Sequence, residues 1–257
     1  MLKLNRISED RARENAAATL DLLGRVLAVP VPGDPLKRQG FHESAGRVSL
    51  KLGLLRYALE SDPDVVRQLF RDAAAHLTRA LVLRQPPDEN THRGPWEAEE
   101  WLNVAACFAK DPDRKAVAKL EPWQYRNPAH REHDALARYL LVLLRHLGGQ
   151  PLDTAGLLEV IEACGAANAA KESRLFLLPA ARGLLAVESQ NLDDWNYALA
   201  QILSAHGREA RSGDLKLLPG GFISFRALML AKFGLDRGMV CRATSDYLPL
   251  ALLGEAK

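Results

Sequence analysis

Apolar residues recur at intervals of three and four along most of the chain, which is the spacing of one face of an α-helix. The two clearest stripes are Val66, Leu69, Phe70, Ala73, Ala74, Leu77, Ala80 and Leu81, and Leu136, Tyr139, Leu140, Leu143, Leu144 and Leu147. A weaker stripe near the start consists of Ala17, Leu20, Leu23 and Leu27. Each pattern predicts an amphipathic helix whose apolar face is buried.

Polar residues that can cap helices stand just before several of these stripes. Asp62-Pro63, Asp111-Pro112 and Asn127-Pro128 each combine a capping side chain with a proline suited to the first helical turn. Ser8 and Asp153 are also predicted to cap helices. These signals predict five helix starts.

Glycine and proline mark the helix ends and the connections. Gly148-Gly149 is expected to end the second clear stripe in a left-handed turn. The loop 31–35 contains two prolines and a glycine, so the next helix is predicted to begin near His42. Further helices are expected over 170–187, 193–206 and 221–233, and Pro219-Gly220-Gly221 is expected to be a plain turn.

The chain is therefore expected to be all-α, with about nine to eleven helices in a bundle or an irregular stack of α-hairpins. Its 257 residues can form one helical domain, residues 1–257, with a possible internal boundary in the polar, proline-rich loop 85–95. No repeat of fixed period is present, which disfavours a tetratricopeptide-like array.

Charge and hydropathy limit the kinds of partner that the chain is expected to bind and the cell compartment in which it is expected. The net charge of +2 lacks the strong basic bias of a nucleic-acid-binding protein, so no nucleic-acid partner is expected. Charged residues interrupt the first twenty positions, and the apolar stretch 139–144 is too short to span a bilayer. We expect a cytoplasmic protein without a membrane partner.

Residues that could perform chemistry are few and scattered. Cys107, Cys164 and Cys241 are isolated and odd in number, and are interpreted as buried thiols in a reducing compartment. His130 and His133 have a spacing that can chelate a metal, but no third ligand is evident, so ordinary half-exposed histidines are expected. The sequence predicts no catalytic residue, no metal and no cofactor.

The segment Trp96-Glu-Ala-Glu-Glu-Trp101 has the most distinctive composition. Glu97 and Glu100 are three residues apart and share a helical face, and the stretch 86–101 has a local charge of −4. Paired carboxylates can serve as general acid and base, and an acidic patch between aromatic residues can bind a protein partner. Glutamates on a solvated face near a helix N-terminus are the simplest of the three interpretations.

The C-terminal third contains a series of segments in a characteristic order. Asp193 to His206 is followed by a Gly221-Phe-Ile-Ser helix with Asp236-Arg-Gly238, and then by Ser245-Asp-Tyr-Leu-Pro249. Over roughly Leu192 to Leu253 the chain resembles the immunity protein 49 family, predicted immunity proteins encoded beside toxins of bacterial polymorphic-toxin systems.

The segment 101–111 resembles a middle helix of that family more weakly. Two departures suggest a divergent subgroup: Thr244 stands where the family has an acidic residue, and Gly207-Arg208 where it often has aromatic residues.

The resemblance implies a cytoplasmic antitoxin that binds a toxin encoded beside it and blocks its active site or substrate path, without catalysis of its own. The residues expected to contact the toxin are Trp96, Glu97, Glu99, Glu100 and Trp101. The motif residues expected to be structural are Asp236, Gly238, Asp246, Tyr247 and Pro249. The alternatives are a generic α-helical adaptor without a toxin partner and an enzyme with an unrecognised helical active site.

Overall fold

The computed structural model describes residues 4–85, 95–125 and 134–254. All regular secondary structure in these ranges is helical, which confirms the expectation of an all-α chain with about nine to eleven helices. None of the helices in these ranges is both long and apolar enough to cross a membrane.

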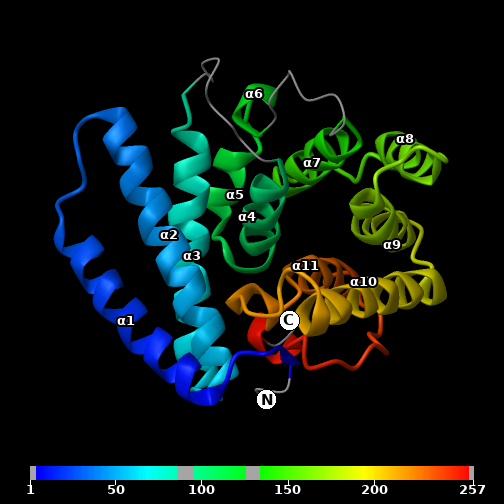
Figure 1. Ribbon diagram of the computed structural model, residues 1–257. Helices are drawn as coiled ribbons and strands as arrows, with labels where there is room; N and C mark the ends of the chain where they lie inside the picture. The colour runs from blue at the N-terminus through cyan, green and yellow to red at the C-terminus, as the bar shows by residue number, and fades with distance from the viewer. Residues whose placement is uncertain (1–3, 86–94, 126–133, 255–257) are drawn as a thin grey trace.

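The N-terminal third forms a layer of three antiparallel helices, α1 (Glu9–Ala28), α2 (Pro35–Ala58) and α3 (Pro63–Val82), with α1 outermost (Figure 1). Helices α2 and α3 make the most extensive contact in the molecule. Two glycines of α2 allow this approach: a Cβ atom on Gly53 would lie 2.6 Å from the Phe70 ring, and one on Gly46 would lie 2.7 Å from Leu77. Glycine is required here by space rather than by backbone angle.

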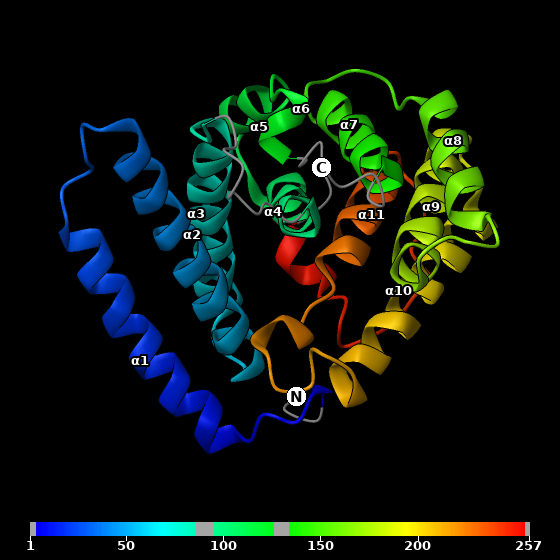
Figure 2. The ribbon, with the colours of Figure 1, turned by 45° about the horizontal axis from the view of Figure 1, so that its top comes forward.

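The remaining helices build the centre and the far side of the molecule. They are α4 (Pro95–Phe108), α5 (Asp111–Val117), α6 (Pro122–Tyr125), α7 (Asp134–Leu147), α8 (Thr154–Gly165), the π-helical turn η3 (Ser173–Leu177), α9 (Leu178–Glu188), α10 (Leu192–Ser212), the 3₁₀ turn η4 (Pro219–Gly221), α11 (Phe225–Leu235) and the 3₁₀ turn η5 (Leu250–Leu253). Helices α4 and α11 pack together at the centre, with α3 against α4 and with α9 and α10 against α11 (Figure 2).

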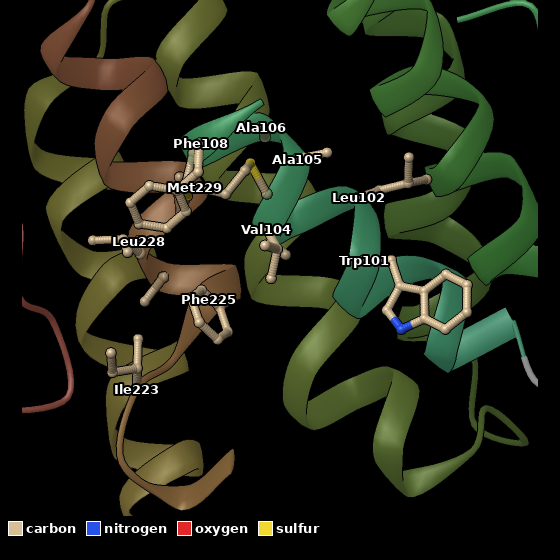
Figure 3. Packing of buried hydrophobic residues seen from close by; sticks show 14 of the residues in the cluster. Trp101, Leu102, Val104, Ala105, Ala106, Phe108, Ile223, Phe225, Leu228 and Met229 are labelled. Atoms are coloured by element: carbon tan, nitrogen blue, oxygen red, sulfur yellow. The ribbon is translucent and has the colours of Figure 1, made fainter. Parts of the chain in front are cut away.

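The core is one cluster of buried apolar side chains that extends from Leu4 to Leu252. Phe108 of α4 and Phe225 of α11 lie at its centre (Figure 3). Both rings contact Phe70 of α3, each with its centroid 5.2 Å away. Aromatic contacts of this kind add to the stabilisation from buried area. The α4–α11 contact is therefore the structural centre of the fold.

Most of the predicted helix signals are confirmed. Both clear stripes are buried, with only Leu69 partly open. The side chains of Ser8, Asp62 and Asp153 accept backbone hydrogen bonds at the starts of α1, α3 and α8. Gly149 follows α7 with a φ of +88°, the left-handed stop that its position predicted.

The prediction that the second helix begins near His42 is wrong, because α2 begins at Pro35. The carboxylate of Asp34 accepts a hydrogen bond of 2.8 Å from the backbone amide of Lys37, and Pro35 occupies the first turn. Asp34-Pro35 is thus a start signal of the same kind as Asp62-Pro63, and the proline that was interpreted as a helix breaker begins the helix.

The predicted apolar face of α1 is wrong except at Leu23. Leu20 and Leu27 are exposed, and the face that packs against α2 consists of Ala12, Ala16, Thr19 and Leu23. Because α1 packs mainly against one neighbour, it buries only a narrow stripe, and small side chains bring the two helices close together.

Three further boundaries differ from expectation. Helix α5 begins at Asp111 itself, since Lys110 is the N-cap and makes no side-chain capping bond. Helix α10 continues six residues past His206, to Ser212. Helix α11 begins at Phe225 after the Ser224 cap, with the expected turn at 219–221 before it. The predicted start at 127–128 and nearly all of the predicted loop 85–95 lie outside the described residues.

Candidate functional site

The distinctive acidic segment lies on the first two turns of α4, which is surrounded by α3, α7 and α11. Trp101 has only 1% of its surface exposed. Its ring lies between two guanidinium groups, with the Cζ atom of Arg47 5.1 Å from its centroid and that of Arg84 4.9 Å. Cation–π contacts and burial make Trp101 part of the core rather than of an open surface.

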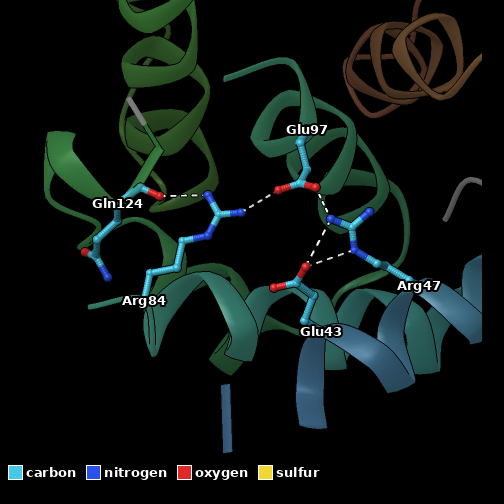
Figure 4. Close-up of polar contacts among 5 residues, drawn as sticks. All are labelled: Glu43, Arg47, Arg84, Glu97 and Gln124. Atoms are coloured by element: carbon cyan, nitrogen blue, oxygen red, sulfur yellow. Dashed lines mark hydrogen bonds and ion pairs between the residues drawn. The ribbon is translucent and has the colours of Figure 1, made fainter. Parts of the chain in front are cut away.

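Glu97 lies at the centre of an ion-pair network that joins three helices (Figure 4). One carboxylate oxygen accepts a hydrogen bond of 2.8 Å from Arg84, and the other pairs with Arg47, which also pairs with Glu43 of α2. Arg84 donates a second bond, of 2.9 Å, to the backbone carbonyl of Gln124. Burial by itself would lower the pKa of Arg47, but Glu97 and Glu43 outweigh it and raise that pKa.

Glu99 forms the second buried ion pair of α4. Its carboxylate accepts two parallel hydrogen bonds of 2.7 Å from Arg226 of α11 and one of 2.6 Å from Asn103. The side chains of Glu99 and Arg226 are only 4% and 15% exposed. Burial alone would lower the pKa of Arg226, but the Glu99 carboxylate outweighs it and raises that pKa overall.

The interpretation of Glu97 and Glu100 as glutamates on a solvated face is wrong for Glu97. The carboxylates of Glu97 and of its neighbour Glu99 are neutralised by arginines, and Glu99 is buried. Glu100 is exposed, and its pKa is raised by desolvation from packed neighbours and by the adjacent Glu99 charge. Arginines from other parts of the chain therefore balance most of the negative charge of this segment.

A pocket of about 350 Å³ opens beside this helix. Its walls come from α4, from α10 and from the η4–α11 segment, with Trp96, Glu100 and Asn103 on one side and His206, Ile223 and Arg226 on the other. The Arg226 guanidinium lies over the ring of Trp96, at 5.7 Å, and over that of Phe176, at 5.1 Å. Aromatic, anionic and cationic groups thus meet at one opening.

Two buried polar atoms near this ion pair have no hydrogen-bond partner among the described residues: Asn103 Oδ1 and the Tyr139 hydroxyl. Burial raises the pKa of Tyr139 and the nearby Glu99 charge adds to it, so the phenol stays protonated. Native proteins rarely leave such atoms unsatisfied, and a water molecule or a polar ligand group would complete them. These atoms lie inside the fold behind the pocket, so a buried water molecule is the simplest partner for them.

Burial shifts the pKa values of His206, Cys107 and Cys164, and each shift favours the neutral form of the side chain. Burial lowers the pKa of His206 to about 4, and its Nε2–H donates to the Gly221 carbonyl at 3.3 Å, so the imidazole is neutral near pH 7. Burial raises the pKa of Cys107 and raises that of Cys164 to about 11. Both are buried as predicted, whereas Cys241 is only partly buried. Thiols of this kind stay protonated and unreactive at neutral pH.

Metal binding has no support in the part of the chain that the structure describes, where no group of three or more His, Cys, Asp or Glu side chains surrounds a possible ion position. His130 and His133 lie outside the described residues.

The C-terminal motif joins the two ends of the chain. The hydroxyl of Tyr247 donates a buried hydrogen bond of 2.7 Å to the Leu4 carbonyl, and its ring packs edge-on against His206. The backbone carbonyl of Tyr247 accepts from the amide of Ser224, the cap of α11. Tyr247 is thus a contact point for the N-terminal segment, α10 and α11.

The other motif residues also have structural contacts. Asp236 ends α11 and pairs with Lys232 at 2.6 Å, and Gly238 has a φ of +75° that favours glycine. The backbone carbonyl of Asp246 accepts a bond of 2.6 Å from Tyr57, and Pro249 precedes η5. Asp236, Gly238 and Asp246 thus lie at a helix end, at a left-handed turn and at a contact with α2.

The sequence analysis missed the arginines that define the site. Arg226 lies 127 positions from Glu99, and Arg47 lies 50 positions from Glu97, so no local spacing indicates either pair. Asn103 and His206 carry signals no stronger than those of the other scattered polar residues. No family model, no curated protein and no solved structure matches the chain.

Proposed function

We propose that this chain is a bacterial immunity protein that binds a cytosol-acting toxin encoded beside it and blocks the toxin's active site or substrate path. The support comes from the ordered C-terminal segments over roughly Leu192 to Leu253 that resemble the immunity protein 49 family. The contacts of these segments support a structural role for the motif: Tyr247 joins the N-terminal segment to the C-terminal one, and Asp236 and Gly238 form the exit of α11.

The pocket beside α4 is the observation that favours one surface of the chain as the toxin-binding site. Trp96 is half-buried over Arg226, and Glu100 is exposed at the same opening. Tryptophan and arginine dominate the energetics of tight protein interfaces, and a tight complex needs such anchors. We propose that Trp96 and Glu100 contact the toxin, with Glu97 at the edge.

Glu99 and Trp101 have a different role in this proposal. Trp101 is buried, and Glu99 lines the pocket with only 3% of its surface exposed. Glu99 fixes the Arg226 guanidinium beneath Trp96, and Trp101 fixes the helix between Arg47 and Arg84. They position the contact surface.

Growth of cells that produce the toxin domain encoded directly upstream, with and without this chain, tests the proposal. The chain should restore growth. A Glu100→Lys variant should protect less, because it reverses an exposed charge at the pocket, while Glu14→Lys on α1 serves as the matched control and should protect fully. Glu97→Lys is unsuitable, since it would place a third cation beside Arg47 and Arg84.

Lack of protection by the wild-type chain would contradict the antitoxin role and favour a helical adaptor without a toxin partner. Full protection by Glu100→Lys would retain the role but place the interface on another surface.

A further inference from the structure

A second concave surface lies between the η3–α9 segment and α10. It comprises two adjoining pockets of about 400 and 430 Å³, both lined by Arg182 and Gln201. The pockets therefore form one groove, which we call the α9–α10 groove. None of the residues that line this groove lines the pocket beside α4.

One end of the groove is basic. Arg174, Arg182 and Arg208 line it, and their guanidinium groups make no ion pair with any described carboxylate. Other arginines of the chain form ion pairs: Arg138 with Glu159, and Arg145 with Asp153. Three unpaired cations around one pocket repel one another, and an anionic partner would relieve that repulsion.

The other end is apolar. Leu158 and Tyr197 expose 55% and 62% of their surfaces there, beside the half-buried Ile161 and Leu185. The described carboxylate at this end, Asp194, accepts a hydrogen bond of 2.7 Å from the side chain of its neighbour Asn191. Tyrosine and arginine are both enriched at the centres of protein interfaces, and the exposed Leu158 adds apolar surface beside them.

The two walls are regular, which suits a regular occupant. Tyr197, Gln201, Ser204 and Arg208 follow one another at four-, three- and four-residue spacing along α10. On the opposite wall the π-helical turn η3 precedes Pro179, which has no amide hydrogen and is poorly accommodated inside an α-helix. Such wide turns recur at functional sites.

We propose that the α9–α10 groove binds an acidic, amphipathic helical segment of a partner protein. Its glutamate or aspartate side chains pair with Arg174, Arg182 and Arg208, and its apolar face covers Leu158 and Tyr197. A free anion such as phosphate would satisfy the arginines but would leave the apolar end uncovered. The groove goes beyond the proposed function, since none of its lining residues belongs to the pocket of Trp96 and Glu100.

A fluorescein-labelled peptide made of repeated Glu-Leu-Leu-Glu-Glu-Leu-Ala units, titrated with the full-length chain and followed by fluorescence anisotropy, tests this proposal. The wild-type chain should bind it. Arg182→Glu should weaken binding by about tenfold or more. Arg71→Glu, at an exposed and unpaired arginine of α3, is the matched control and should leave affinity within about twofold.

The apolar half of the groove has its own test. Tyr197→Ala should weaken peptide binding by about fivefold or more, because a buried aromatic contact is lost. The proposal is overturned if Arg182→Glu behaves like Arg71→Glu, if the same peptide with lysine for glutamate binds equally well, or if inorganic phosphate displaces the peptide while Tyr197→Ala has no effect. None of these readouts involves the toxin, so failure here is distinct from failure of the antitoxin role.

Discussion

The buried Glu99–Arg226 pair gives the sharpest stability prediction. Glu99→Gln keeps the size and shape of the side chain and removes its charge, so no cavity term enters. The change takes the counter-charge from an Arg226 side chain that is only 15% exposed, and replaces one of two parallel 2.7 Å bonds with a donor facing a donor. Breaking one partner of a buried pair costs about 3–5 kcal/mol.

The lower end of that range, about 3 kcal/mol, is expected because part of the Arg226 side chain reaches solvent and the Glu100 carboxylate also interacts with it. The thermal midpoint should fall by about 6–12 °C for a chain of this size. Urea unfolding and thermal unfolding, both followed by far-ultraviolet circular dichroism, measure the two quantities. Glu14→Gln, on the exposed surface of α1, is the control and should change the free energy of unfolding by less than about 0.5 kcal/mol.

A double variant separates the loss of charge balance from general damage. Glu99→Gln with Arg226→Met removes both charges and should recover at least half of the lost stability, because no buried charge is left alone. A single-variant loss below about 1 kcal/mol, the range of exposed pairs, would refute the reasoning. It would mean that the pair behaves as a surface contact.

Three further predictions concern the rest of the fold. Tyr247→Phe removes the buried hydroxyl bond to the N-terminal segment and should lower the free energy of unfolding by about 1–2 kcal/mol in urea titration. Gly234→Ala would drive a methyl group into the Trp195 ring and should cost about 2 kcal/mol, whereas Gly24→Ala on α1 meets no atom within 4 Å and should stabilise by about 0.5–1 kcal/mol. Burial lowers the pKa of His206 to about 4, so the neutral imidazole stabilises the folded state above pH 6.5. As the pH falls from 6.5 towards 4, the free energy of unfolding should decrease by about 3 kcal/mol because of this group. A His206→Gln variant should lose less stability over that window in urea titrations, and an equally steep loss would assign the pH dependence to other groups.

Helix positions could be predicted where local chemistry decides them. The α3 stripe and the Asp62-Pro63 start were both recognisable, because capping and apolar periodicity act within a few residues. The start of α2 was missed although Asp34-Pro35 carries the same signal, since three other turn-forming residues surround it. A helix-start signal and a loop signal overlap at this point of the sequence, and in the structure the helix start prevails.

The face of α1 and the environment of α4 were not readable from spacing alone. Which side of α1 is buried depends on α2, so Leu20 lies outside while Ala16 lies inside. The role of Glu99 depends on Arg226, which reaches it only after the whole chain has folded. Charges that look free in sequence become structural when distant cations meet them.

The most direct test of the antitoxin role is calorimetric titration of the purified chain with an inactivated form of the toxin domain encoded directly upstream. The proposal predicts one-to-one binding with a nanomolar dissociation constant, which is the affinity that neutralisation requires. Absence of binding at micromolar concentrations would contradict it for that pair.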